Sequence, residues 1–212
     1  MSMKNFLSIL ILLLPGFLSG QHFNGGLVAG GVVSQLDGDT YEGYHKFGFL
    51  GGGYVNYRIS KHSQLQLEMQ YIQKGSRKNA NLEKGDPDSY LLRLHYMEIP
   101  VMYQYIFMDK LYAEAGVAPD VLLGSYEEKD GLEVPYNTVP LRKITLGGII
   151  GVSWALTNHL KAGFRMHYSL LSIRESQPEG YPEGFKRFLF ETGQFHNLMS
   201  VSISWDFKSM HR

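Results

Sequence analysis

Two polar side chains in the C-terminal half have the types and the spacing of a nucleophilic site. His167 and Ser169 stand two residues apart in LKAGFRMHYSLLSI, so both project from one face if this segment is extended. A histidine beside a serine hydroxyl can serve as the general base that activates the serine. No G-x-S-x-G or comparable nucleophile motif accompanies the pair, and such residues on one polar face more often belong to a hydrogen-bond network. We therefore predict no catalytic residue and no enzymatic activity.

Metal and cofactor chemistry is no better supported. The chain has no cysteine, which excludes thiolate ligands, disulfides and a cysteine nucleophile. Its eight histidines are scattered, with none paired at ligand spacing. Asp37-Gly38-Asp39 is similar to the start of a calcium loop but lacks the remaining ligand positions and the closing glutamate, so it fits a polar turn. We predict no metal and no cofactor.

A larger set of charged and amide side chains alternates with apolar residues along extended segments. In the segment 64–71 (QLQLEMQY), for example, every second residue is polar. This period of two predicts strands with one polar and one apolar face. The predicted polar-face residues are Arg58, Gln66, Glu68, Gln70, Arg93, His95, Glu98, Gln104, Glu114, Lys143, Arg165, His167 and Asp206. Because they carry both signs, and because a buried charge must be paired, we expect an interlocked network of ion pairs and hydrogen bonds.

Eight strands are needed to position these residues. They are predicted at residues 27–35, 44–59, 64–74, 89–105, 111–123, 144–156, 160–173 and 195–207. The connections after the first, third, fifth and seventh are long and polar, whereas those after the second, fourth and sixth are short. In the fourth strand we predict a phase slip near Met97, where a bulge helped by Pro100 would return Glu98 to the polar face. In the fifth strand, Pro119 predicts an irregular outer end.

These strands fit a barrel that crosses a membrane. They are longer than the roughly 5–6 residues usual in globular sheets, and about 9–11 residues span a bilayer when tilted. Aromatic residues near strand ends are typical of interfacial girdles: they are Tyr57, Tyr105, Trp154 and Trp205. The rival interpretation is a soluble ligand-binding barrel, which would need an apolar interior and a polar outer surface. Here one face of the strands is uniformly apolar and the other is polar and charged, which suits a barrel with its apolar face toward lipid. The predicted fold is an all-β, eight-stranded antiparallel transmembrane barrel, an up-and-down meander with a lumen filled by side chains.

The N-terminus carries an export signal. Lys4 gives a basic start, Phe6–Leu14 is a short apolar run, and Leu18-Ser19-Gly20 ends in small residues, the layout of a secretory signal peptide. An N-terminal membrane anchor is the alternative, but the run is shorter than the ~20 residues of a spanning helix. We predict a signal peptide at 1–20 and a barrel domain at 21–212. The equal numbers of basic and acidic residues, 20 each, argue against a nucleic-acid partner.

Several motifs resemble those of a known family. They are the segment 34–53 (SQLDGDTYEGYHKFGFLGGG), the segment 68–71 (EMQY), the segment 94–101 (LHYMEIPV) and Leu111-Tyr112. Together they resemble the PorT-like outer-membrane β-barrel family, also described as the outer membrane protein beta-barrel domain. The resemblance implies an eight-stranded barrel of the OmpA and OmpX kind in a Gram-negative outer membrane, reached by Sec-dependent export. The namesake of that family assists protein secretion by the type IX system.

The expected function is therefore non-enzymatic, a structural or interaction role through long extracellular loops, with an accessory role in type IX secretion as its narrower form. The alternative is a narrow, gated porin-like channel for small solutes or ions. The expected partners are outer-membrane lipid and lipopolysaccharide, together with proteins of the secretion machinery or the cell surface. We expect a monomer.

Overall fold

The computed structural model describes residues 23–38, 43–81, 83, 85–108, 110–134, 140–174 and 193–208. The predicted signal peptide and Asp39 lie outside these residues. The strands are β1 (Phe23–Asp37), β2 (Lys46–Ser60), β3 (Ser63–Lys78), β4 (Tyr90–Glu98), β5 (Val101–Phe107), β6 (Leu111–Lys129), β7 (Leu132–Glu133), β8 (Ile144–Ala155), β9 (Leu160–Ser169) and β10 (Phe195–Asp206). No helix among the described residues is long and apolar enough to cross a bilayer.

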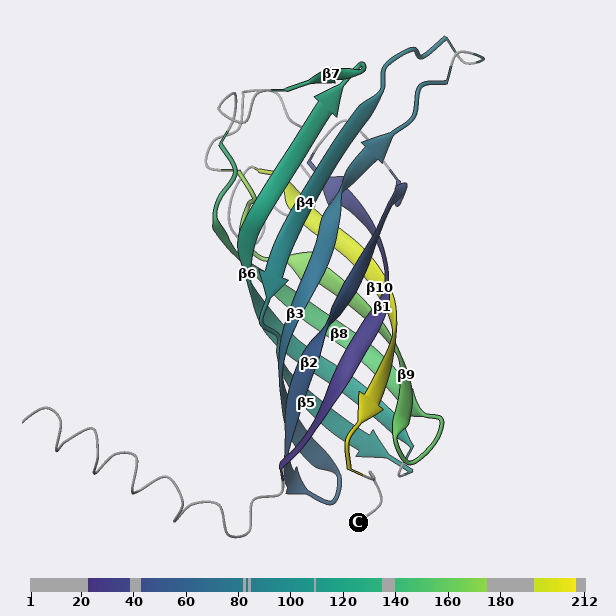
Figure 1. Cartoon of the computed structure of the whole chain (residues 1–212), viewed down its shortest axis with the longest axis vertical. Helices are drawn as coiled ribbons and strands as arrows, with labels where there is room; N and C mark the ends of the chain where they lie inside the picture. The colour runs from purple at the N-terminus through teal and green to yellow at the C-terminus, as the bar shows by residue number, and fades with distance from the viewer. Residues whose placement is uncertain are drawn as a thin grey trace, which may run out of the picture.

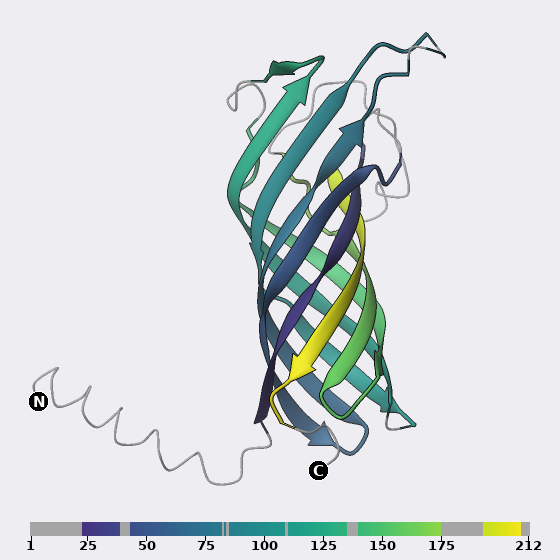
Figure 2. The ribbon, with the colours of Figure 1, turned by 45° about the vertical axis from the view of Figure 1, so that its right-hand side comes forward.

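The strands close into a ring. Each long strand pairs antiparallel with its neighbours, and β1 pairs with both β2 and β10. Strands β4 and β5 occupy one position between β3 and β6, while β7 pairs only with the end of β6. Figures 1 and 2 show the strands tilted around a common axis. The ring has eight strand positions, which confirms the predicted all-β antiparallel meander.

The two ends of the barrel differ in their connections. At one end, which we call the short-turn rim, the strands are joined across residues 61–62, 108–110 and 156–159, and β10 also ends there. At the other end, the long-loop rim, the connections are residues 38–45, 79–89, 130–143 and 170–194. In Figure 1 the long-loop rim is at the top, beside β7. This asymmetry is the predicted one and is typical of outer-membrane barrels.

Most of the outer surface is an apolar belt. Exposed apolar side chains cover all sides of the ring: among them are Leu27, Phe49, Val55, Leu67, Met69, Val101, Val117, Ile150, Val152, Phe164, Val201 and Ile203. Near the short-turn rim the exposed side chains are aromatic: they include Phe23, Tyr57, Tyr105, Phe107, Trp154 and Trp205. A surface this apolar is unfavourable in water but suits the lipid hydrocarbon, with the aromatic ring at its boundary.

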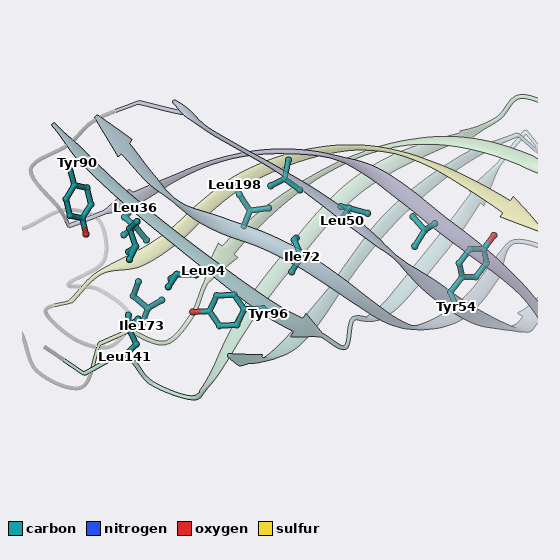
Figure 3. Packing of buried hydrophobic residues seen from close by; sticks show 13 residues of the cluster. Leu36, Leu50, Tyr54, Ile72, Tyr90, Leu94, Tyr96, Leu141, Ile173 and Leu198 are labelled. Carbon is teal, nitrogen blue, oxygen red and sulfur yellow. The ribbon is translucent and has the colours of Figure 1, made fainter. Parts of the chain in front are cut away.

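The interior changes character along the barrel axis. Toward the long-loop rim it is filled by an apolar plug, which we define as Leu36, Tyr90, Leu92, Leu94, Leu141 and Ile173, all buried (Figure 3). On the outside at this level, Gln73, Arg77, Arg93 and Glu128 are exposed or half-buried. Here the barrel has an apolar core and a polar surface, like a soluble protein. Below this level the surface is apolar, and the interior holds buried charges together with apolar side chains such as Ile72, Met102 and Ile149.

The fourth predicted strand has no phase slip. Its even-numbered residues point inward from Tyr90 to Ile106. Along β3 the pairing of Gln70 with Glu98 continues as Leu67 with Val101, so the register is unbroken across Ile99-Pro100. The irregularity lies instead in β6, opposite the step from His95 to Tyr96. The bulge predicted near Met97 is therefore wrong, because leucines rather than polar residues face inward at the outer end of β4.

Strand β6 is also longer than predicted. It continues past Leu123 to Lys129, pairs with β4 along that extension and ends in a small hairpin with β7. Pro119 was expected to make its outer end irregular, yet it lies within the strand, where its carbonyl oxygen accepts a hydrogen bond of 2.9 Å from the Ile99 amide. Proline lacks only a donor, so its acceptor still joins the ladder.

Candidate functional site

The centre of the lumen is crossed by one guanidinium group. Arg165 of β9 donates from Nη1 and Nη2 to the two carboxylate oxygens of Glu68 on β3, at 3.0 and 2.7 Å. Its Nε donates to Glu114 of β6 at 2.7 Å. None of these three strands is a neighbour of another in the ring. The central bridge, defined as Arg165, Glu68 and Glu114, therefore ties three separate parts of the barrel wall together.

Amide and hydroxyl groups complete the central bridge. Gln66 donates to Glu68 at 2.6 Å, and Gln104 and Ser153 donate to Glu114 at 3.0 and 2.6 Å. All these side chains are buried. Hydrogen bonds to both carboxylates lower the cost of removing the charges from water, so the bridge can persist at the level of the membrane.

A second group of charges lies between the central bridge and the apolar plug. The ammonium of Lys74 contacts Glu98 at 2.6 Å and Asp120 at 2.8 Å. Gln70 also donates to Glu98, at 2.7 Å, and Nδ1 of His167 stands 3.6 Å from it. Glu98 thus belongs to the interior, as predicted, but regular alternation rather than a bulge places it there.

A third group closes the lumen near the short-turn rim. Lys161 lies 3.2 Å from Asp206, which also accepts a hydrogen bond of 2.9 Å from Asn24. The ammonium of Lys161 sits 5.3 Å from the ring centres of both Tyr54 and Tyr112. Two such cation–π contacts hold the lysine side chain between two aromatic faces, so the group fills the lumen cross-section with one cation and two rings.

Most residues of the predicted polar face do lie inside the barrel. Those brought into the three charged groups or their hydrogen-bonded partners are Gln66, Glu68, Gln70, Glu98, Gln104, Glu114, Arg165, His167 and Asp206. Arg58 is half-buried at the short-turn rim, where it donates to the Lys61 carbonyl at 3.4 Å.

Three residues of the prediction lie outside the lumen. Arg93 is exposed on the outer surface, and His95 is half-buried there with Nδ1 in hydrogen-bond contact with the Tyr71 hydroxyl. Both were misplaced because the polar face turns outward where the barrel has an apolar core. Lys143 is exposed one residue before β8 begins, so it belongs to the long-loop rim rather than to the lumen.

Other buried charged residues were missed. Lys74 continues the even-numbered polar positions of β3, and Lys161 stands on the polar face of β9, so alternation alone could have found both. Asp120 was hidden by the expectation that the strand becomes irregular at Pro119. At the long-loop rim, Arg174 binds Glu127 through two contacts of 2.9 Å, and no sequence pattern linked these distant residues.

His167 and Ser169 do not contact each other as a nucleophilic pair would. The hydroxyl 3.4 Å from His167 Nε2 belongs to Ser200, whereas Ser169 accepts a hydrogen bond from the His196 amide. His167 and Ser169 therefore have different hydrogen-bond partners. Among the described residues, no three histidine or carboxylate groups come close enough to hold a metal ion.

Comparisons with known proteins point to one class. Residues 19–175 match the family model described as outer membrane protein beta-barrel domain. The structure is similar to Neisserial surface protein A, with a TM-score of 0.53 and 14% identity, covering 87% of this chain and 97% of that one. Ail of Yersinia pestis gives a TM-score of 0.49 at 10% identity, covering 87% of this chain and 99% of that one. OprG of Pseudomonas aeruginosa gives a TM-score of 0.43 at 12% identity, covering 88% of this chain and 95% of that one. No curated protein sequence matches the chain.

Proposed function

Because the chain belongs to the outer membrane protein beta-barrel domain family, we propose that it is a closed, non-conducting and non-enzymatic barrel of the outer membrane. In this proposal its long-loop rim faces the cell exterior and acts as a binding surface. The protein works as a monomer, exported by the Sec pathway and freed of residues 1–20. Membership of the family supports a location in the outer membrane.

The observation that carries the proposal is the filling of the lumen at two levels. The apolar plug occupies the outer end, and all of its leucines are buried. The central bridge crosses the middle, where Arg165 contacts carboxylates from two separate parts of the wall. An eight-stranded barrel is just wide enough for its own side chains to fill, so little space is left for hydrated ions.

Planar-bilayer recordings test the closed lumen. We expect no stepwise conductance from the wild-type protein or from Arg165→Gln, because the apolar plug remains in both. Heat-shifted gel mobility of protein recovered from the same bilayers or vesicles verifies that a folded barrel was present. Reproducible conductance steps from the wild type would reject the closed barrel and favour the channel.

Cysteine labelling tests the orientation. The natural chain has no cysteine, so a single introduced thiol reports its own location. Asp88→Cys places the thiol at the long-loop rim and Asn158→Cys places it at the short-turn rim, both at exposed positions. A membrane-impermeant maleimide added to intact cells should label only Asp88→Cys. Labelling of Asn158→Cys alone would show that the short-turn rim faces the cell exterior and would contradict the proposed orientation.

A specific observation favours the channel as the alternative function. Three charged groups follow one another along the lumen, centred on Lys74, Arg165 and Lys161. They include five carboxylates, which are Glu68, Glu98, Glu114, Asp120 and Asp206. Since these exceed the three Lys and Arg cations, any channel should be cation-selective. Arg165→Gln should then change the conductance of the channel. The closed barrel instead predicts no conductance from the wild type or from Arg165→Gln.

The motifs similar to those of the PorT-like family support a narrower role. They favour an accessory function in type IX secretion, exerted through proteins that bind the long-loop or short-turn rim. Deletion of the coding sequence should then reduce the amount of type IX cargo at the cell surface, and the Arg165→Met variant, if folded, should restore it. Normal cargo levels in the deletion strain would remove this role and leave the structural one.

A further inference from the structure

A cavity of about 360 Å³ opens at the long-loop rim between the outer ends of β2, β3 and β4. Four cationic side chains line it: Lys46, Arg77, Lys78 and Arg93. We call this feature the basic cavity. The single carboxylate in its lining is Glu128, whose Oε2 accepts a hydrogen bond from the Tyr126 hydroxyl. The basic cavity is separate from the lumen groups described above.

Three of these cations have no carboxylate partner among the described residues. Lys78 is paired with Asp86 at 2.8 Å, but no ion pair within the described part of the chain involves Lys46, Arg77 or Arg93. Arg77 donates from Nε to the amide oxygen of Asn79 at 2.8 Å, and the Lys46 ammonium donates to the Phe47 carbonyl. Both of these acceptors are neutral. Positive charges gathered without a counter-charge favour the binding of an anion, and guanidinium groups match phosphate geometry best.

The electrostatics of Lys46 agree with this arrangement. Lys46 is buried and lies beyond the apolar belt, outside the membrane-spanning part of β2. Burial lowers the pKa of its ammonium from the usual value, and the positive charges of Arg93 and Arg77 lower it further. An anion between these groups would offset the repulsion and the loss of hydration together.

The apolar lining indicates which kind of anion fits. Phe47 and Leu91 contribute to the cavity wall, and 74% of the Phe47 side chain is exposed. On the outer surface, Phe47 is followed along β2 by Phe49, the start of the apolar belt. The basic cavity therefore stands at the boundary where lipid headgroups meet hydrocarbon. A free phosphate ion would use only the cations, whereas a phospholipid or phosphorylated glycolipid would use both parts of the wall.

We propose that the basic cavity binds the phosphate of an anionic lipid headgroup in the outer leaflet of the membrane. The proposal rests on the outward orientation of the long-loop rim given under the proposed function. The guanidinium groups of Arg77 and Arg93 donate to the phosphate oxygens, Lys46 adds a third cation, and Phe47 lies along the first part of an acyl chain. The lipid would then hold the outer ends of β2, β3 and β4 at a fixed depth.

Calorimetric titration of the refolded protein, residues 21–212, in neutral detergent tests the site. The probe is diphosphoryl lipid A in mixed micelles, and saturable binding is expected for the wild type. The Arg77→Gln/Arg93→Gln double variant should bind at least ~10-fold more weakly, because each charge-assisted hydrogen bond contributes a measurable share of affinity. The matched control is Lys143→Gln, which removes an exposed cation at the same rim outside the basic cavity and should stay within ~2-fold of the wild type.

Folding controls and further ligands show which results would reject the proposed lipid-phosphate site. Both substituted groups are exposed, and heat-shifted gel mobility verifies that the variants are folded. Unchanged affinity of the double variant, or an equal loss in Lys143→Gln, would reject the basic cavity as the site. Inorganic phosphate binding as tightly as lipid A, or equal binding of dephosphorylated lipid A, would reject a lipid phosphate as the ligand.

The test in micelles does not depend on how the barrel is inserted. If lipid A binds as expected but intact cells label Asn158→Cys, the phosphate site stands and its assignment to the outer leaflet is overturned. If labelling supports the outward rim but lipid A does not bind, the proposed orientation stands and the lipid site fails.

Discussion

Arg165 is the side chain whose removal should disturb the lumen most. Replacing it with methionine leaves Glu68 and Glu114 buried without their cation. Loss of one partner from a buried ion pair typically costs ~3–5 kcal/mol, because the remaining charge is uncompensated. We expect Arg165→Met to lower the free energy of unfolding by that order, measured as the urea dependence of the mobility shift between folded and unfolded protein.

The triple variant Glu68→Gln/Glu114→Gln/Arg165→Met is the control for this prediction. It removes the two carboxylates together with the cation, so it should recover most of the lost stability. A single variant as stable as the wild type would mean that water reaches the central bridge.

Leu94 and Arg93 test the reversed polarity at the outer end of β4. Leu94 is fully buried in the apolar plug, whereas Arg93 is exposed on the opposite face of the same strand. Leu94→Ala should cost ~2–5 kcal/mol through lost contacts and a cavity, and Arg93→Ala should stay within ~0.5 kcal/mol. Urea unfolding of both variants measures the difference. If Arg93→Ala were the more destabilising variant, Arg93 would point into the barrel, as the sequence alone predicts.

The sequence separated the two faces of each strand but could not show which face is inside at every height. Alternation placed Glu68 and Arg165 correctly because a membrane-level lumen is polar. The same rule misplaced Arg93 and His95 because the outer end of the barrel stands in water. The prediction for Lys143 was wrong for another reason, because the alternation was extended to a residue that precedes the start of β8.

Among the strands, β1 offers two neighbouring glycines with opposite surroundings. A Cβ atom on Gly30 would stand 2.3 Å from the Val201 carbonyl oxygen, whereas one on Gly31 would meet nothing within 4 Å. Gly30→Ala should therefore destabilise the barrel by ~1–3 kcal/mol through overpacking, while Gly31→Ala should be neutral or slightly stabilising. Urea midpoints of the two variants give the comparison. Equal midpoints would show that β1 and β10 can separate locally without cost.

Strand positions were predictable because period-two alternation survives along most of the chain, and all eight predicted strands exist. Their ends were harder to predict. The sequence after Leu123 loses its clear alternation, yet β6 continues to Lys129 because β4 offers it hydrogen-bond partners. Such an extension depends on a partner strand that is distant in the chain, from His95 with Gly124 to Tyr90 with Lys129, and Pro119 offered a local reason to stop the strand early.

At the scale of the whole molecule, the closed ring predicts a heat-modifiable protein. In the outer-membrane fraction extracted with mild detergent, unboiled protein should stay compact on a gel and boiled protein should migrate differently. The reason is that no strand can leave the ring without exposing backbone groups on both sides. Absence of a shift, with the protein found soluble in the periplasm, would favour the soluble barrel and contradict the inside-out assignment of the apolar belt.

The closing pair of strands also dictates when this protein can fold. Strand β1 lies beside β10 from Gly26 with Asp206 to Asp37 with Phe195, so the first strand of the ring is paired with the last. A growing chain therefore cannot complete the ring until β10 has been made, and closure joins strands far apart in the sequence, which is entropically costly and slow. Until then the future apolar belt is exposed in water. Closure therefore has to wait until β10 has been made, and until then these apolar segments are prone to aggregate in water.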